Sequence, residues 1–186
     1  MSYPELYILR HGETHWNAEN RMQGELNSPL TPKGEVDAAR QGEILAGLDL
    51  TGFAFLCSPQ GRAVQTAGIA LAQVATSIHT EDRLREIGVG DWSGRLRSEL
   101  PMPEGKDPFM AQYEIAPGGE GFGALEVRCR DFLGDLQGPT VLVTHGITSR
   151  MIRSIVGGAG AISVSTVHGG QGCVYHLKNG AQNLLT

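Results

Sequence analysis

Short apolar runs bounded by turn-forming residues recur along the chain and predict buried strands. Three of them are plain, at residues 6–9 (LYIL), 53–58 (FAFLCS) and 140–144 (TVLVT). A weaker run at 77–80 (SIHT) predicts a further short strand. The run at 173–178 (CVYHLK) predicts a last strand, which we place at an edge of the sheet.

The segments between these runs carry apolar residues at helical spacing. Thr31 followed by Pro32 is typical of an N-cap and a first helical residue, and Ser58-Pro59 repeats that pair. Gly157-Gly158 predicts the end of the last helix. The predicted helices cover residues 30–48, 59–75, 122–136 and 147–157.

Strands that alternate with helices predict an α/β fold. We expect a three-layer sandwich in which helices flank a mostly parallel central sheet. Residues 88–120 are rich in Gly and Pro and show no clear period, so they predict a lid-like insertion with at most short helices. The length of 186 residues and the absence of a composition shift indicate a single domain over 1–186.

Composition narrows the classes of partner. The net charge of −5 and the lack of a Lys/Arg tract argue against nucleic acid or an anionic membrane, and they leave a small molecule as the expected partner. The three cysteines are widely spaced, which argues against a disulfide framework. No signal peptide or membrane span is apparent in the sequence, so we expect a cytoplasmic protein.

Two predicted strands end in the same device, an apolar run followed by His and Gly. The first ends in Arg10-His11-Gly12 and the other in Thr144-His145-Gly146, while Arg62 follows a third strand at the start of a helix. The carboxyl ends of parallel strands share one edge of a sheet, and neighbouring strands lie about 4.8 Å apart. We therefore expect both imidazoles to meet there, with Gly12 letting an anion approach closely.

Two histidines and two arginines at one sheet edge favour the binding of an anion between them. Guanidinium groups bind phosphate through paired hydrogen bonds, and an imidazole is a nucleophile near neutral pH. This set predicts phosphoryl transfer, whereas acyl transfer would need a serine elbow that the chain lacks. Glu86 is the expected general acid, and Glu120 is its rival.

Other acidic and histidine residues near His11 are less suited to catalysis. Glu13 follows His11 so closely that a loop or capping role is expected. His15 stands four residues after His11, a spacing that binds zinc on a helix, but Gly12 and the turn-rich sequence argue against a helix there. We therefore predict no metal site.

The motifs together resemble the histidine phosphatase superfamily, also called the phosphoglycerate mutase-like family. The sequence RHGETHWN is followed in family order by LTPKG, GRAVQTA, LREIGVGDWSG and VTHG. The resemblance implies that His11 is the nucleophile and Glu86 the acid and base. It further implies a phosphate pocket and a substrate rim. The pocket comprises Arg10, Asn17, Arg62, His145 and Gly146, and the rim comprises Gln23 and Gly24. The resemblance also makes His145 a catalytic residue, which steadies the group in transfer.

The activity implied by the resemblance is hydrolysis of a phosphomonoester through a phosphohistidine, with no metal or other cofactor. A phosphoglycerate mutase is the alternative, and a non-catalytic phosphate-binding module is a further one. The charge of the insertion favours the phosphatase over the mutase. Residues 98–127 hold several carboxylates and one cation, Lys106, so they would repel a phosphoglycerate or a bisphosphate. These carboxylates are Glu99, Glu104, Asp107, Glu114, Glu120 and Glu126. The predicted edge strand 173–178 would allow two copies to pair as a homodimer.

Overall fold

A six-stranded mixed sheet forms the centre of the molecule. The computed structural model describes residues 3–104 and 107–186. Four parallel strands stand in the order β3-β2-β4-β1, and two antiparallel strands, β5 and β6, extend the sheet beyond β1. The strands are β1 (Leu6–Arg10), β2 (Ala54–Cys57), β3 (His79–Thr80), β4 (Thr140–Thr144), β5 (Val174–Lys178) and β6 (Ala181–Leu185).

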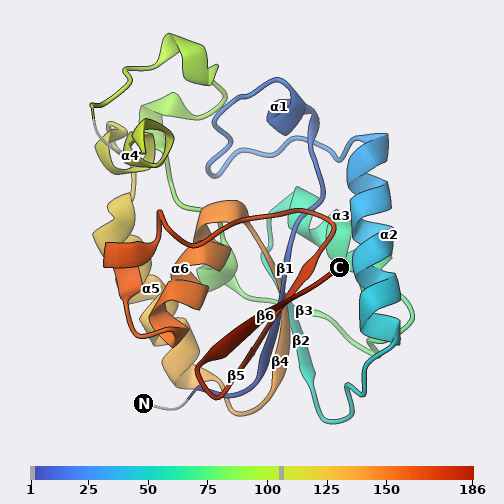
Figure 1. Ribbon diagram of the computed structural model, residues 1–186. Coiled ribbons are helices and arrows are strands. Elements are labelled where there is room, and N and C mark those ends of the chain that lie inside the picture. Colours follow the sequence, from blue (N-terminus) through green and yellow to red (C-terminus); the bar gives the residue numbers. More distant parts are fainter. Residues whose placement is uncertain (1–2, 105–106) are drawn as a thin grey trace.

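Helices cover both faces of this sheet, as the alternating pattern predicts (Figure 1). On one face lie α2 and α3, and on the other lie α5 and α6, while α1 and α4 sit beyond the carboxyl ends of the parallel strands. No helix within the described ranges has both the length and the apolar character needed to span a bilayer. The helices are α1 (His15–Ala18), α2 (Pro32–Ala46), α3 (Gly61–Ala70), α4 (Pro108–Ile115), α5 (Gly121–Asp135) and α6 (Gly146–Val156).

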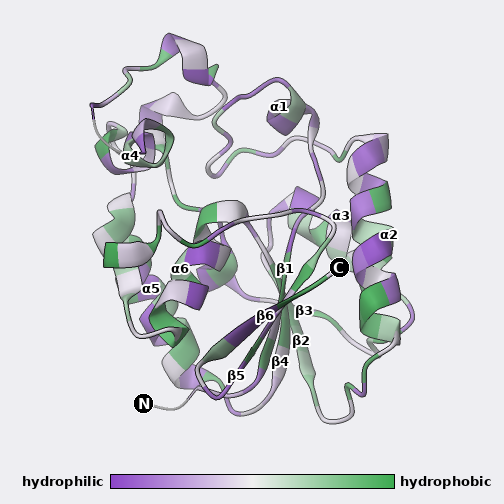
Figure 2. Cartoon of the chain, in the orientation of Figure 1, coloured by the Kyte–Doolittle hydropathy of each residue, from purple (hydrophilic) through white to green (hydrophobic). Residues whose placement is uncertain are grey.

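The central strands are apolar on both sides because each face packs under a helical layer. Leu6 and Ile8 join the core beneath α5 and α6, whereas Tyr7 and Leu9 join the core beneath α2 and α3. Figure 2 shows the apolar colour along the strands and mixed colours on the surrounding helices. A strand buried on both faces reads as a continuous apolar run, which is why β1 and β4 were predictable.

Helix α2 begins as predicted, but α3 begins later and ends earlier. Thr31 caps α2, since its hydroxyl accepts a hydrogen bond from Gly34 N at 3.1 Å, and Pro32 is the first helical residue. Ser58 does not cap α3. Its hydroxyl accepts from Gln60 N at 3.3 Å and lies 2.7 Å from His145 Nε2, and Gln60 is the N-cap residue. Helix α3 stops at Ala70, five residues before the predicted end, where the chain turns.

Strand β5 is not at the edge of the sheet, so that prediction is wrong. It pairs with β1 on one side and with β6 on the other, and both of its edges are therefore occupied. Pairing between two copies through residues 173–178 is excluded for this reason, and a homodimer stays a prediction. Strand β6 escaped notice because its residues are mostly exposed and follow no alternating pattern.

The segment predicted as a lid folds over the carboxyl edge of the sheet. It contains α4 and two 3₁₀ turns, at Gly90–Trp92 and Arg97–Glu99. A small third core fixes it to the rest of the domain. That core consists of Met22, Val89, Trp92, Leu100 and Ala116.

Gly12 is a site where a side chain should strongly destabilise the fold. A Cβ there would lie 2.0 Å from the carbonyl oxygen of Gly34, so the need for glycine comes from packing against the start of α2. We expect Gly12→Ala to lower the free energy of unfolding by about 3 kcal/mol, measured by urea denaturation. Gly68→Ala is the matched control. It meets nothing within 4 Å and should stabilise α3 by roughly 0.5–1 kcal/mol. An unchanged stability of Gly12→Ala would refute this packing argument.

Candidate active site

The two His-Gly devices meet at the carboxyl edge of the sheet. Strands β1 and β4 are parallel neighbours with Arg10 opposite Thr144, and His11 N donates to Thr144 O at 2.9 Å. The ring centroids of His11 and His145 lie 5.1 Å apart. The juxtaposition expected from the sequence is therefore present.

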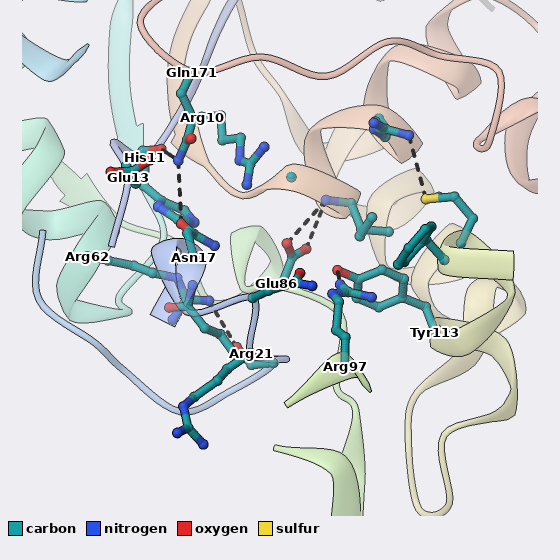
Figure 3. Close-up of a pocket in the computed structure, with 18 residues that line it drawn as sticks. Arg10, His11, Glu13, Asn17, Arg21, Arg62, Glu86, Arg97, Tyr113 and Gln171 are labelled. Atoms are coloured by element: carbon teal, nitrogen blue, oxygen red, sulfur yellow. Dashed lines mark hydrogen bonds between the residues drawn. The ribbon is translucent and has the colours of Figure 1, made fainter. Parts of the chain in front are cut away.

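A cavity of about 400 Å³ opens at this edge, between the ends of the strands and the segment that contains α4. Figure 3 shows Glu86 between a group formed by His11, Asn17 and Arg62 and a second group formed by Arg97 and Tyr113. Most residues singled out from the sequence line the cavity, and His145 lies behind the wall, fully buried. Those that line it are Arg10, His11, Asn17, Gln23, Gly24, Arg62, Glu86 and Gly146.

The ring of His11 is held in one tautomer. Its Nδ1 lies 2.8 Å from the carbonyl oxygen of Gly12, which can only accept, so Nδ1 carries the proton and Nε2 keeps its lone pair. Burial, together with the guanidinium groups of Arg62 and Arg10, holds the pKa of His11 well below its usual value. The imidazole is therefore neutral at pH 7, the form that a nucleophile requires.

His145 supports the same site from inside the protein. Its Nε2 lies 2.7 Å from Ser58 Oγ, while its Nδ1 is buried without a hydrogen-bond partner among the described residues. Burial first, and then the charge of Arg62, holds the pKa of His145 well below its usual value. An unpaired buried nitrogen beside His11 is a costly feature in a fold, and it is typical of functional sites.

Two guanidinium groups flank the histidines, and neither forms an ion pair with a carboxylate within residues 3–104 and 107–186. Arg62 is 1% exposed, and it donates to the carbonyl oxygens of Leu26 at 2.7 Å and Gly24 at 2.9 Å. Burial lowers the pKa of Arg62 to about 10, which leaves it charged at pH 7. The Nε atoms of Arg10 and Arg62 are buried and unpaired in the described part of the chain. Two desolvated cations with free donors form a cradle suited to a phosphoryl group.

The side chain of Glu86 lies at the N-terminus of α6 and binds the first free backbone amides of that helix. The Glu86 carboxylate accepts hydrogen bonds from Ile147 N at 3.2 Å and from Thr148 N at 3.0 Å. The backbone amides at the start of α6 therefore donate their hydrogen bonds to the Glu86 carboxylate. The oxygens of Glu86 nevertheless reach the cavity, where Figure 3 shows them facing its interior.

Asn17, Gln23 and Gly24 are tied to neighbouring loops. Asn17 Oδ1 accepts from Thr14 N at 3.2 Å, so any contact with a phosphate must come from the Asn17 NH₂ group. Gln23 Nε2 donates to Thr14 Oγ1 at 2.8 Å, which leaves its own Oε1 buried and unpaired among the described residues. The carbonyl of Gly24 holds Arg62, and this role was not foreseen.

Several cavity residues escaped the sequence analysis. Gln171 reaches across from the loop before β5, where its Nε2 donates to His11 O at 3.1 Å. The remaining ones are Asn20, Arg21, Arg97, Phe109, Met110, Tyr113, Ile147 and Arg150, most of them from segments without periodicity or conspicuous motifs. Arg150 was the most accessible to prediction, because it lies one helical turn beyond Gly146 on the same face of a predicted helix.

The carboxylates of residues 98–127 do not line the cavity, so the charge argument drawn from them is wrong. Asp107 caps α4, and Glu114 accepts from Phe122 N at 2.7 Å. Glu120 pairs with Arg128 at 2.7 Å and Glu126 with Arg130 at 2.6 Å. Lys106, the cation set against them, lies outside the described residues. The cavity itself is lined by five arginines and by only two carboxylates, Glu13 and Glu86.

The geometry does not support Glu120 as the general acid or a metal site near His15. Glu120 is engaged by Arg128 and by Gly88 N, and it is not among the residues that line the cavity. Glu13 accepts from the Thr31 hydroxyl at 3.0 Å, a loop role as expected. A short helix does begin at His15, but His15 is exposed. Across residues 3–104 and 107–186, no three His, Cys, Asp or Glu side chains gather as metal ligands would.

The low pKa of His11 predicts a loss of stability in mild acid. The unfolded chain binds a proton on each histidine near pH 6.5, whereas folded His11 stays neutral until much lower pH. The free energy of unfolding should therefore fall below pH 6.5, by up to about 1.4 kcal/mol per pH unit for each such histidine. The free energy of unfolding, measured in urea between pH 7.5 and 5.5, should fall less steeply with decreasing pH for His11→Asn than for the unmodified protein. The exposed His79→Asn is the matched control, and equal slopes for His11→Asn and the unmodified protein would contradict the prediction.

The chain is similar in sequence and in fold to known mutase-like and phosphatase proteins. The chain is 36% identical over 154 residues to the "Probable phosphoglycerate mutase GpmB" of Salmonella choleraesuis, covering 77% of this chain and 70% of that protein. The α-ribazole phosphatase of Shigella flexneri superimposes with a TM-score of 0.81 at 26% identity, covering 97% of this chain and 94% of that one. YhfR of Bacillus stearothermophilus superimposes with a TM-score of 0.78 at 32% identity, with the same coverage.

The family assignment rests on a match that spans nearly the whole chain. The sequence profile described as "Histidine phosphatase superfamily (branch 1)" matches residues 6–183, which include both His-Gly devices, Arg62 and Glu86. The same residues converge on one cavity in the fold described above. The chain belongs to the histidine phosphatase superfamily, branch 1.

Proposed function

We propose that this protein is a metal-independent phosphomonoesterase that works through a phosphohistidine on His11. The observation that carries the proposal is the state of the His11 ring. Its Nδ1 proton is fixed by Gly12 O, its Nε2 has no hydrogen-bond partner among the described residues, and two guanidinium groups with unpaired Nε atoms flank it. A small phosphorylated metabolite is the expected substrate, because the cavity is small and rich in arginine.

The first step is the transfer of the phosphoryl group to His11. Nε2 attacks phosphorus, the bond between phosphorus and the ester oxygen breaks, and Glu86 gives a proton to the departing alcohol. Arg10 and Arg62 balance the charge on the phosphoryl oxygens, while His145 supports the site from behind the cavity wall with an Nδ1 that has no partner among the described residues. In the second step water loses a proton to Glu86 and attacks the phosphohistidine, which releases phosphate and restores Nε2.

A phosphoglycerate mutase is the second candidate, and two observations favour it. The chain resembles a protein named as such, and the arginine-rich cavity removes the charge argument against a phosphoglycerate. Both activities share the phosphohistidine and differ in whether water or a substrate hydroxyl receives the phosphoryl group. The catalytic residues alone do not separate them.

Assays of the purified protein test the proposal. We expect release of phosphate from p-nitrophenyl phosphate that is unchanged by a chelator. Conversion of 3-phosphoglycerate to 2-phosphoglycerate should be slower than phosphate release from 3-phosphoglycerate. Faster conversion than release would establish the mutase, and activity lost with chelator and restored by a divalent metal would overturn metal independence.

A further inference from the structure

The cavity holds a second pair of cations, on the side away from His11. Arg97, in a 3₁₀ turn of the segment over the sheet edge, and Arg150, on α6, both line the cavity. Both contact α4, since Arg97 bonds Gln112 and Tyr113 while Arg150 lies 3.5 Å from Met110 Sδ. Figure 3 shows Glu86 between His11 and the Arg97–Tyr113 pair.

Arg97 is rigidly held by neutral groups. One guanidinium nitrogen donates to Gln112 Oε1 at 3.0 Å, another donates to the Tyr113 hydroxyl, and the guanidinium stacks 4.8 Å from the centroid of the Tyr113 ring. Gln112 is itself fully buried, and its amide donates back to the carbonyl of Arg97 at 3.4 Å. These contacts fix the position of the charge without neutralising it.

The balance of charge in the cavity calls for more than one phosphate. Arg21 is paired with Glu19 at 2.5 Å, and Glu13 lies 3.5 Å from Lys33. Within the described ranges, no carboxylate forms an ion pair with Arg10, Arg62, Arg97 or Arg150. A phosphate dianion beside His11 and the single carboxyl group of Glu86 do not match the four guanidinium charges of the cavity, so positive charge remains at Arg97 and Arg150 for another anion.

We propose that Arg97 and Arg150 form a distal anion subsite, and that the substrate is a phosphomonoester whose alcohol part carries a second anionic group. This inference rests on the proposed phosphatase function for the role of His11. Guanidinium groups bind carboxylate and phosphate alike, so the shared chemistry is an oxyanion a few bonds from the ester. The cavity volume of about 400 Å³ accommodates a phosphate together with a short carbon chain and such a group.

The first test compares esters that differ in that group. 3-Phosphoglycerate and glycerol 3-phosphate share the phosphate and the three-carbon chain, and differ by a carboxylate in place of a hydroxymethyl group. Fructose 1,6-bisphosphate and fructose 6-phosphate make the same comparison for a second phosphate. We expect kcat/KM to favour the doubly anionic ester by about 10-fold or more in at least one pair. Preference in one pair identifies the anion as carboxylate or phosphate, and no preference in either pair overturns the proposal.

Variants then assign the preference to the two arginines. Arg97→Met and Arg150→Met remove the charge and keep the apolar stem, and each should lower the ratio of kcat/KM values between the paired esters by about 10-fold. Arg97→Lys should restore part of the ratio, because it restores the charge. Arg40→Gln, an exposed arginine on α2, is the control for loss of one positive charge. An unchanged ratio in both methionine variants would overturn the proposal.

A binding measurement separates this inference from the proposed function. In a His11→Ala background no phosphohistidine can form at position 11, and calorimetry reports the affinity for each ester directly. The subsite predicts tighter binding of the doubly anionic ester, lost on adding Arg150→Met. If that preference holds while the unmodified protein releases no phosphate from any ester, the phosphatase proposal fails and the subsite stands. Equal affinities for the two esters contradict the subsite whatever the activity.

Discussion

Replacement of His11 by alanine is expected to lower kcat/KM for p-nitrophenyl phosphate by about 10⁴-fold or more, because a covalent path loses its nucleophile. No other described side chain can replace it. His145 is the nearest imidazole, but it lies behind the cavity wall with Nε2 engaged by Ser58. Initial rates of p-nitrophenol release measure the effect.

His15→Ala is the matched control for His11→Ala. His15 lies four residues further on at the start of α1, it is exposed, and it does not line the cavity. Its loss should change kcat/KM by less than about threefold. The account would fail if His11→Ala, shown to be folded by its circular dichroism and melting temperature, retained more than a tenth of the activity.

Replacement of Glu86 by glutamine is expected to cost about 10²- to 10⁴-fold in kcat/KM, and the loss should depend on the leaving group. An alkyl phosphate such as glycerol 3-phosphate departs as a strongly basic alkoxide and needs a proton. p-Nitrophenolate departs readily without one. The loss in kcat/KM should therefore be at least about tenfold larger for glycerol 3-phosphate than for p-nitrophenyl phosphate.

Glu120→Gln provides the control, because Glu120 is the other acid that the sequence offered. It pairs with Arg128 away from the cavity, so its replacement should leave kcat/KM for both esters within about threefold. Equal losses for the two esters in Glu86→Gln would contradict the role of Glu86 as the acid. A leaving-group dependence in Glu120→Gln instead would transfer that role to Glu120.

The strands and the clustering of the candidate site residues were predictable because local signals and topology agree. An apolar run flanked by turns predicts a strand whatever surrounds it, and parallel strands deliver their carboxyl ends to one edge. The positions of His11, Arg10, Arg62 and His145 followed from those two facts. The N-cap of α2 was equally local, since Thr31 and Pro32 satisfy the helix start by themselves.

Features set by distant partners were not predictable in the same way. Ser58 looks like a cap, but His145, 87 residues away, takes its hydroxyl. The carboxylates of the insertion look like a negative surface facing the substrate, but most of them cap helices or pair with arginines elsewhere. Arg97 lies in a segment without periodicity, so only the folded chain reveals that it faces the cavity.

Strand β6 was missed from the sequence for a similar reason. Strand β6 is largely exposed and carries no alternation of apolar and polar residues, so its pattern resembles that of a loop. It is a strand because β5 offers a free edge and Asn179-Gly180, both with positive φ, turn the chain back. Tertiary pairing and turn geometry together decide this element.

Trapping the phosphorylated intermediate shows whether His11 carries the phosphoryl group during turnover. The protein is mixed with p-nitrophenyl phosphate and quenched in alkali within milliseconds, which preserves phosphohistidine, and its peptides are then analysed by mass spectrometry. The account predicts one added phosphoryl group on His11, at a higher level in Glu86→Gln because the water-activating base is missing. Turnover without any phosphorylated protein, or with phosphate on a different residue, would contradict it.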